Sequence, residues 1–139
     1  MIIKEVQDEI VDEFSMFDDW MQRYEYIIDL GKSLPLIEGQ YKTEGNIIAG
    51  CQSKVWVYGE QKEDKIVFTS DSDAILTKGI IAILIRVFSN QKAADILEAN
   101  TDFIDKIGLK EHLSPTRANG LVSMVKKIKM YALAFEAKN

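Results

Sequence analysis

The single cysteine, Cys51, is the residue whose type most restricts the chemistry open to this sequence. It is the only thiol among 139 residues, and His112 is the only imidazole. One thiol cannot form an internal disulfide or a paired redox motif, and one thiol with one imidazole is too few for an ordinary zinc site. Cys51 therefore acts with one sulfur, and no metal is expected.

Two interpretations of Cys51 are open on the residues alone. Unpaired cysteines are among the most frequently buried residue types, where they behave as small hydrophobic side chains. A nucleophilic cysteine instead needs a thiolate, which a nearby cation, a histidine or a helix N-terminus favours. Candidate cations are Lys54, Lys78 and Arg117. His112 would complete a cysteine hydrolase pair, but nothing in its spacing from Cys51 supports that enzyme class.

The residues beside Cys51 favour a loop that presents the side chain. Gly50 precedes the cysteine and permits a backbone conformation closed to other residues. Gln52 and Ser53 follow it, and their side chains could hydrogen-bond the loop or an incoming sulfur, although ordinary turn chemistry explains them equally well. This loop setting raises the chance that Cys51 is reactive.

Short strands on both sides are expected to hold this loop. Residues 46–49 and 54–60 are strand candidates, and the second is rich in valine and aromatic residues. A turn at 62–65 leads into 66–69, which predicts an antiparallel hairpin. The predicted fold is α+β, with a small antiparallel sheet of about three strands packed against helices.

Helices are expected before and after the sheet. From Ile10 onward, apolar residues at steps of three and four predict two N-terminal helices, with a break near Phe17 and Asp18 as the cap of the second. A run of capping residues that ends at Asp73 precedes an apolar segment expected at the centre of the fold. The later helices are expected over 74–88, 91–99, 102–107 and from Pro115, with Ser114 as the last cap.

Composition excludes several classes of partner. The net charge is −5, and no stripe of lysine and arginine is present, so nucleic acid is not an expected partner. The N-terminus lacks a secretory pattern, and the longest apolar run, 80–85, is too short for a bilayer. Length and hydrophobic content predict one domain over 1–139, located in the cytoplasm and not bound to a membrane.

Three stretches of the sequence resemble the motifs of a known family and follow one another in the same order. They are GCQSKVW at 50–56, DSDAI with KGIIA at 71–82, and HLSPTR with GL at 112–121. A weaker stretch, YIIDLG followed by LP, lies at 26–35. Together they resemble the SufE family of sulfur-acceptor proteins, over about residues 19 to 130. The same motifs are shared with CsdE-type proteins, so they do not separate these two roles.

The resemblance implies a fold, a partner and a role for the cysteine. The fold would be related to IscU-type cluster scaffolds, and the partner would be a SufS-type cysteine desulfurase that carries its own pyridoxal phosphate. Cys51 would accept a persulfide sulfur from this enzyme. The protein would also stimulate the desulfurase and pass the sulfur toward a downstream iron–sulfur scaffold, and it would hold no cofactor of its own. A cluster scaffold needs about three or four thiolate or imidazole ligands, so this chain can carry sulfur but not a cluster.

Two further residues inside these motifs are site candidates. Arg117 lies in the first turn of a helix, where its charge opposes the helix dipole, which favours a role in a site or an interface. Asp73 is equally explained as a helix cap and as a part of the loop beside Cys51. His112 is expected to make a structural hydrogen bond. Gly79 and Gly120 are predicted to allow close approach of another backbone.

Two other functions remain open as alternatives to sulfur transfer. The first is a binding module that activates a desulfurase while Cys51 is only packed, and the second is an independent cysteine enzyme. For the sulfur carrier, we expect Cys51 to face an apolar pocket in the free protein and to swing out when the partner docks.

Overall fold

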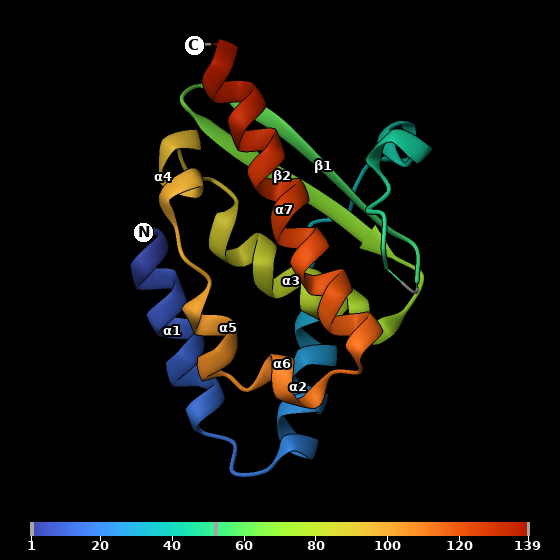
Figure 1. Ribbon diagram of the computed structural model, residues 1–139, viewed down its shortest axis with the longest axis vertical. Coiled ribbons are helices and arrows are strands. Elements are labelled where there is room, and N and C mark those ends of the chain that lie inside the picture. Colours follow the sequence, from blue (N-terminus) through green and yellow to red (C-terminus); the bar gives the residue numbers. More distant parts are fainter. Residues whose placement is uncertain (1, 52, 139) are drawn as a thin grey trace.

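A two-stranded antiparallel sheet lies between helices in the computed structural model, which describes residues 2–51 and 53–138. Strand β1 (Val55–Lys62) pairs with β2 (Lys65–Ser72) along its whole length. Glu63 adopts a left-handed conformation, with φ of 59°, in the turn between them. The predicted hairpin is confirmed, and so is the α+β class. Figure 1 shows helix α7 (Pro115–Lys138) crossing in front of the hairpin.

The third predicted strand is reduced to a single bridge. Ile47 is bridged to Trp56, and the Ile48 amide donates to the Val55 carbonyl at 2.8 Å. A 3-10 turn, η2 (Glu44–Asn46), precedes this bridge, and Gly50 turns the chain after it with φ of 86°. Because only a short segment between these turns is extended, it cannot form a longer ladder. The sheet of the described residues therefore has two strands instead of about three.

The first two helices depart from the prediction at their starts. Helix α1 (Ile3–Ser15) begins earlier than expected, because Ile3 and Val6 extend its buried apolar stripe. Helix α2 (Trp20–Gly31) is capped by Asp19 and not by Asp18. The Asp19 carboxylate accepts a hydrogen bond from the amide of Gln22 at 2.8 Å.

Helix α3 (Ile75–Phe88) forms the centre of the molecule, as its apolar sequence predicts. Of the two roles left open for Asp73, the helix cap is not the one observed, because Ala74 occupies the N-cap position and no side chain caps the helix. The polar residues before it are instead extended and paired with β1. The Ser70 hydroxyl donates to the Trp56 carbonyl at 2.6 Å, and the Ser72 hydroxyl to that of Lys54 at 2.9 Å.

Helices α2 and α3 pack with their backbones in contact. A Cβ placed on Gly79 would lie 2.1 Å from the carbonyl oxygen of Ile27, and one on Gly31 would lie 3.0 Å from the Gly79 nitrogen. No side chain fits between the two helices at this crossing. The predicted close backbone approach at Gly79 is confirmed.

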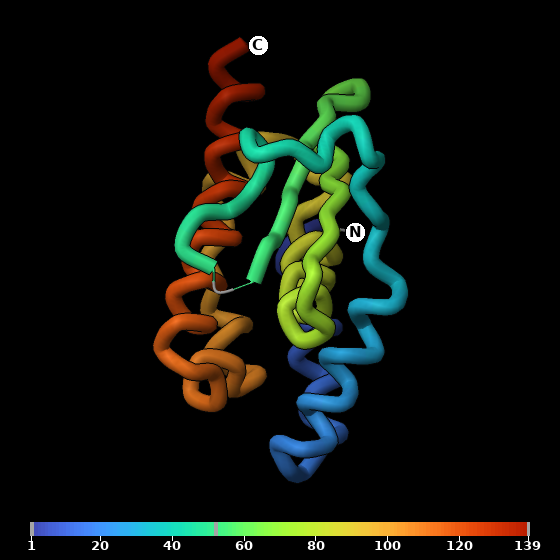
Figure 2. The backbone as a smooth tube through the Cα atoms, turned by 90° about the vertical axis from the view of Figure 1, so that its right-hand side faces the viewer, coloured from blue at the N-terminus to red at the C-terminus, as the bar shows by residue number. Residues whose placement is uncertain are grey.

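The remaining helices cover the other side of α3. Helix α7 starts at Pro115, as predicted. Ser114 caps it as expected, because its hydroxyl accepts a hydrogen bond from the Arg117 amide. In Figure 2, α7 lies on one side of the hairpin, and the residues directly after α2 lie on the other side before the chain crosses over toward α7. Within the described residues, no helix is long and apolar enough to cross a membrane. The short elements are η1 (Gly39–Tyr41), α4 (Ala93–Glu98), α5 (Asp102–Lys106) and α6 (Leu109–His112).

We expect Gly79→Ala to lower the free energy of unfolding by about 3 kcal/mol, because the added methyl group overlaps the Ile27 carbonyl and forces α2 and α3 apart. Urea denaturation measures this change. Gly39→Ala is the control, since a Cβ there meets nothing within 4 Å, and it should change stability by less than about 0.5 kcal/mol. Equal stability of the two variants would contradict the packing argument.

Candidate functional site

Cys51 lies on the loop that leads into β1, with its side chain turned toward α7. Gly50 has the left-handed conformation that its glycine permits, with φ of 86°. The Cys51 thiol is half-buried, and Sγ lies 3.7 Å from the carbonyl oxygen of Gly120, to which it donates. The thiol is thus held against the backbone of a helix that lies far away in the sequence.

A small pocket surrounds this thiol. Its walls come from the Cys51 loop, from α3 and from the first turns of α7. The cavity volume is only about 10 Å³, which is about the space of one water molecule. No substrate fits beside the thiol in this conformation. The lining residues are Cys51, Ser53, Thr77, Ile80, Thr116, Arg117, Gly120 and Met124.

The absence of a side chain at Gly120 leaves room for the Cys51 thiol beside α7. A Cβ on this residue would lie 3.2 Å from Cys51 Sγ and 3.7 Å from Cys51 Cα. The sequence predicted a close approach at Gly120 but not that Cys51 would be its neighbour. Thr116 and Met124 were not expected in the site. Their spacing of four residues from Gly120, on one helix face, was the signal that could have found them.

The charge around Cys51 does not favour a thiolate in this conformation. Burial raises the pKa of the Cys51 thiol, so its neutral form is favoured at neutral pH. Of the three candidate cations, only Arg117 lines the pocket. The Lys54 side chain is exposed, and Lys78 pairs with Asp71 at 3.5 Å. Within residues 2–51 and 53–138, the Arg117 guanidinium has no hydrogen-bond or ion-pair partner.

Asp73 ties the end of the Cys51 loop to the start of α3. Its carboxylate accepts from the Lys54 amide at 3.0 Å, and its own amide donates to the Lys54 carbonyl at 3.2 Å. Asp73 is not part of the pocket lining. Ser53 does line the pocket, whereas Gln52 lies outside the described residues.

His112 is held at a different place from the thiol. Its ring stacks on Trp20 with 4.1 Å between ring centroids, and Nδ1–H donates to the Gly108 carbonyl at 2.9 Å. It makes the structural hydrogen bond expected of it, and it is absent from the described lining of the Cys51 pocket. The structure therefore does not bring together a cysteine–histidine pair.

Comparison with known sequences gives a consistent result. The sequence profile "SufE: Fe-S metabolism associated domain" matches residues 8–132. An uncharacterized SufE-like protein of Rhizobium meliloti is 41% identical over 130 residues, which are 90% of this chain and 93% of that protein. A SufE-like protein of Arabidopsis thaliana, named as chloroplastic/mitochondrial, is 38% identical over 94% of this chain and 35% of its own length.

The fold also has a solved counterpart. The solution structure of a hypothetical protein from Thermus thermophilus matches with a TM-score of 0.78, over 93% of this chain and 94% of that one. The sequence identity is 16%, so the match concerns the fold alone.

We expect Cys51 of the folded protein to react slowly with iodoacetamide at neutral pH, because its raised pKa lowers the thiolate fraction. The rate should increase with pH through a midpoint above the ordinary thiol value of about 8.5. The urea-unfolded chain supplies the reference midpoint, because its thiol is solvated. A midpoint in the folded protein below this reference would contradict the assigned burial.

We expect Gly120→Ala to accelerate the same alkylation several-fold, because the added methyl group would lie 3.2 Å from Cys51 Sγ, closer than an ordinary contact, and would push the thiol outward. The cysteine lies on a loop, so it can move more readily than the α7 backbone. The rate of Gly39→Ala should equal that of the unmodified chain. An unchanged rate in a folded Gly120→Ala variant would show that Gly120 does not hold the thiol inward.

Proposed function

The chain belongs to the SufE family, whose domain is associated with Fe-S metabolism, and from this premise we propose that Cys51 accepts a persulfide sulfur from a SufS-type cysteine desulfurase. One observation carries the proposal: the single thiol lies on a loop, in a pocket with a volume of only about 10 Å³. Because a small substrate has no room there, the sulfur arrives on a partner protein.

The proposed transfer is an exchange between two sulfur centres. The Cys51 thiolate attacks the terminal sulfur of the persulfide on the desulfurase, and a new S–S bond forms at Cys51. The bond to the desulfurase cysteine breaks, and that cysteine leaves as a thiolate, which takes up the proton that Cys51 lost. Sulfur moves without net oxidation or reduction. The protein then passes this sulfur to a downstream iron–sulfur scaffold.

The resting position of Cys51 supports protection before transfer. Burial raises the pKa of the thiol, so stray oxidants and electrophiles meet little thiolate. Outward movement of the loop removes this burial and restores an ordinary pKa at the moment when the partner is docked. Gly50 supplies backbone freedom for the movement, and the bonds between Asp73 and Lys54 anchor the far end of the loop.

Arg117 is the proposed electrostatic partner of the transferred sulfur. Arg117 lines the pocket, and its guanidinium has no ionic partner among the described residues. A positive charge beside the outgoing sulfur stabilises both the attacking thiolate and the ionised persulfide. Ser53, and Gln52 as expected from the sequence, complete the proposed site as hydrogen-bonding neighbours of the loop.

The packed state of the thiol also supports a second candidate. A binding module could stimulate the desulfurase while Cys51 stays inside its pocket, and the raised pKa of Cys51 fits that role. In either case, we propose one domain over 1–139 that acts in the cytoplasm. The site chemistry proposed here rests on motifs that the SufE and CsdE roles share.

Incubation with a SufS-type desulfurase and cysteine should add sulfur to this protein, seen as mass gains of about 32 Da for each sulfur atom. The gain should vanish on reduction and in Cys51→Ser. Intact-mass spectrometry measures the gain, and alanine production measures the desulfurase rate. Stimulation that persists in Cys51→Ser, with no mass gain in the unmodified protein, would instead support the binding module.

The same assay tests Arg117. We expect Arg117→Ala to slow sulfur transfer about tenfold, the size of one charge-assisted interaction, and Arg117→Lys to retain part of the rate. Lys32→Ala removes an exposed cation elsewhere and should transfer sulfur at the unmodified rate. Equal rates for Arg117→Ala and Lys32→Ala would remove Arg117 from the proposed mechanism.

A further inference from the structure

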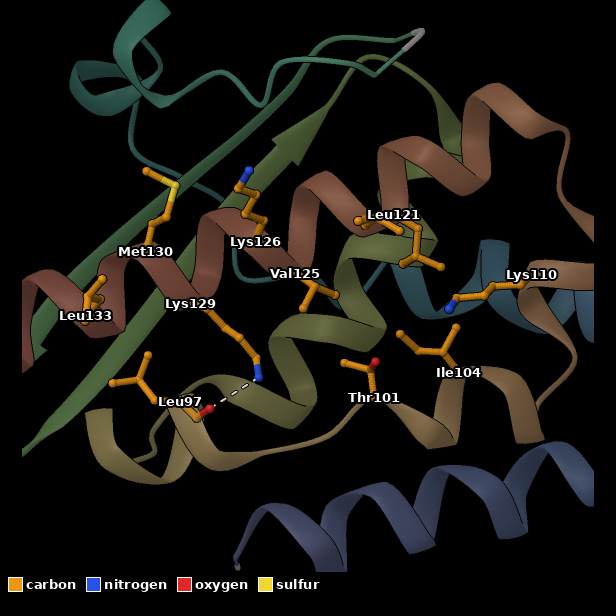
Figure 3. Close-up of a pocket in the computed structure, with 11 residues that line it drawn as sticks. Leu97, Thr101, Ile104, Lys110, Leu121, Val125, Lys126, Lys129, Met130 and Leu133 are labelled. Carbon is orange, nitrogen blue, oxygen red and sulfur yellow. Dashed lines mark hydrogen bonds between the residues drawn. The ribbon is translucent and has the colours of Figure 1, made fainter.

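A groove with a volume of about 560 Å³ lies between α7 and the segment that contains α4, α5 and α6 (Figure 3). Leu97, Thr101 and Ile104 come from the wall opposite α7, and Lys129 reaches across from α7 toward α4. The lining is mainly aliphatic, and none of the described lining residues is acidic. This groove takes no part in the site of Cys51.

The α7 wall exposes apolar side chains that the fold does not cover. Val122 and Met130 are each 56% exposed, and Leu133 is 60% exposed. Large exposed apolar patches on soluble domains often mark interaction sites. Val125, Lys129 and Leu133 follow one another at steps of four, which places them in one ridge of the helix, and Val122, Lys126 and Met130 form the ridge beside it. Such a ridge is the surface against which another helix packs.

The groove carries a positive charge although the chain as a whole is acidic. Lys110, Lys126 and Lys129 all line it, whereas the net charge of the protein is −5. Lys129 donates to the carbonyl of Ala99 at 2.6 Å, and Lys110 lies 3.8 Å from the exposed Asp105. Lys126 has no ion pair within the described residues. Among the described residues, only Lys110 of these three lysines has a carboxylate beside it, so the unpaired charge of the groove comes mainly from Lys126 and Lys129.

We propose that this groove docks an acidic amphipathic helix of a partner protein. Aliphatic residues of that helix, at positions i, i+3, i+4 and i+7, pack on the α7 ridge, and carboxylates at its edges pair with the lysines. The lining from Leu121 to Leu133 extends about 18 Å along α7, enough for three turns of the bound helix. A helix matches the ridge spacing, and its carboxylates match the lysines.

The groove and the Cys51 pocket use different faces of α7. Gly120 and Met124 line the pocket of the thiol, whereas Leu121 and Val125 line the groove. A helix bound in the groove therefore leaves the thiol accessible to a second protein. The proposal goes beyond sulfur transfer and does not require it.

Binding of two designed peptides tests the proposal. One is an amphipathic helix of about 15 residues with leucines at i, i+3, i+4 and i+7 and glutamates at their flanks, and its twin has lysine in place of each glutamate. Fluorescence anisotropy of the labelled peptides measures affinity, and circular dichroism measures the helix formed. We expect the acidic peptide to bind about tenfold more tightly than its twin, with an affinity that falls as salt is added.

Variants of the full chain locate the binding. Leu133→Glu and Lys126→Glu each change an exposed side chain of the groove and should weaken the acidic peptide about tenfold. Met21→Glu changes an equally exposed apolar residue on α2, outside the groove, and should bind as the unmodified chain does. The Cys51 alkylation rate of each variant, compared with that of the unmodified chain, checks that the variant is folded.

Several outcomes would overturn the proposal. They are no binding of the acidic peptide, equal affinity for the two peptides, or equal effects of Leu133→Glu and Met21→Glu. A free protein that sediments as a dimer and becomes monomeric in Leu133→Glu would show that a second copy covers the groove. Displacement of the acidic peptide by decanoate at lower concentration would show a site for small amphiphiles.

Discussion

The contact between the Cys51 thiol and the backbone of α7 at Gly120 is the interaction on which the site depends. It requires α7 to lie in one register against the hairpin, and Tyr131 fixes that register from further along the helix. The Tyr131 hydroxyl donates to Asn46 Oδ1 at 2.7 Å. The Tyr131 ring packs on the backbone of Gly59, so closely that a Cβ on Gly59 would lie 3.1 Å from the ring. The absence of a side chain at Gly59 and at Gly120 thus sets how closely the helix approaches.

Helix α3 supplies the other half of this constraint. Its contact with α2 at Gly79 leaves no space for a side chain, so the two helices meet in one arrangement. Thr77 and Ile80, on either side of Gly79, then form the floor of the Cys51 pocket. Packing at one crossing therefore positions residues of the site at another.

Half-burial of the thiol connects the structure with the proposed chemistry. A fully buried cysteine would be inert, and a fully exposed one would react with any electrophile or oxidant. Cys51 is held between these extremes by a weak hydrogen bond to the Gly120 carbonyl and by packing, while its loop is anchored through Asp73. Weak retention on an anchored loop suits a thiol that must leave its pocket only when a partner is bound.

The sequence by itself determined the number of thiols, the hairpin, the central apolar helix and the close approach at Gly79. These follow from residue counts, from alternation and spacing within short segments, and from the local preferences of glycine and proline. The ordered motifs also predicted the family to which the chain belongs. Apart from the count of thiols and the order of the motifs, these predictions use residues that are near one another in the chain.

Only the tertiary structure decided which residues surround the thiol. Gly120 lies 69 positions after Cys51, and neither residue carries a local signal of the other. In the same way, pairing with β1 kept the residues before α3 extended and took Asp73 from the helix cap to the loop. The reduction of the third predicted strand to a single bridge and the groove beside α7 likewise result from how distant elements pack. Contacts between distant segments depend on the closure of the whole chain, which no local pattern encodes.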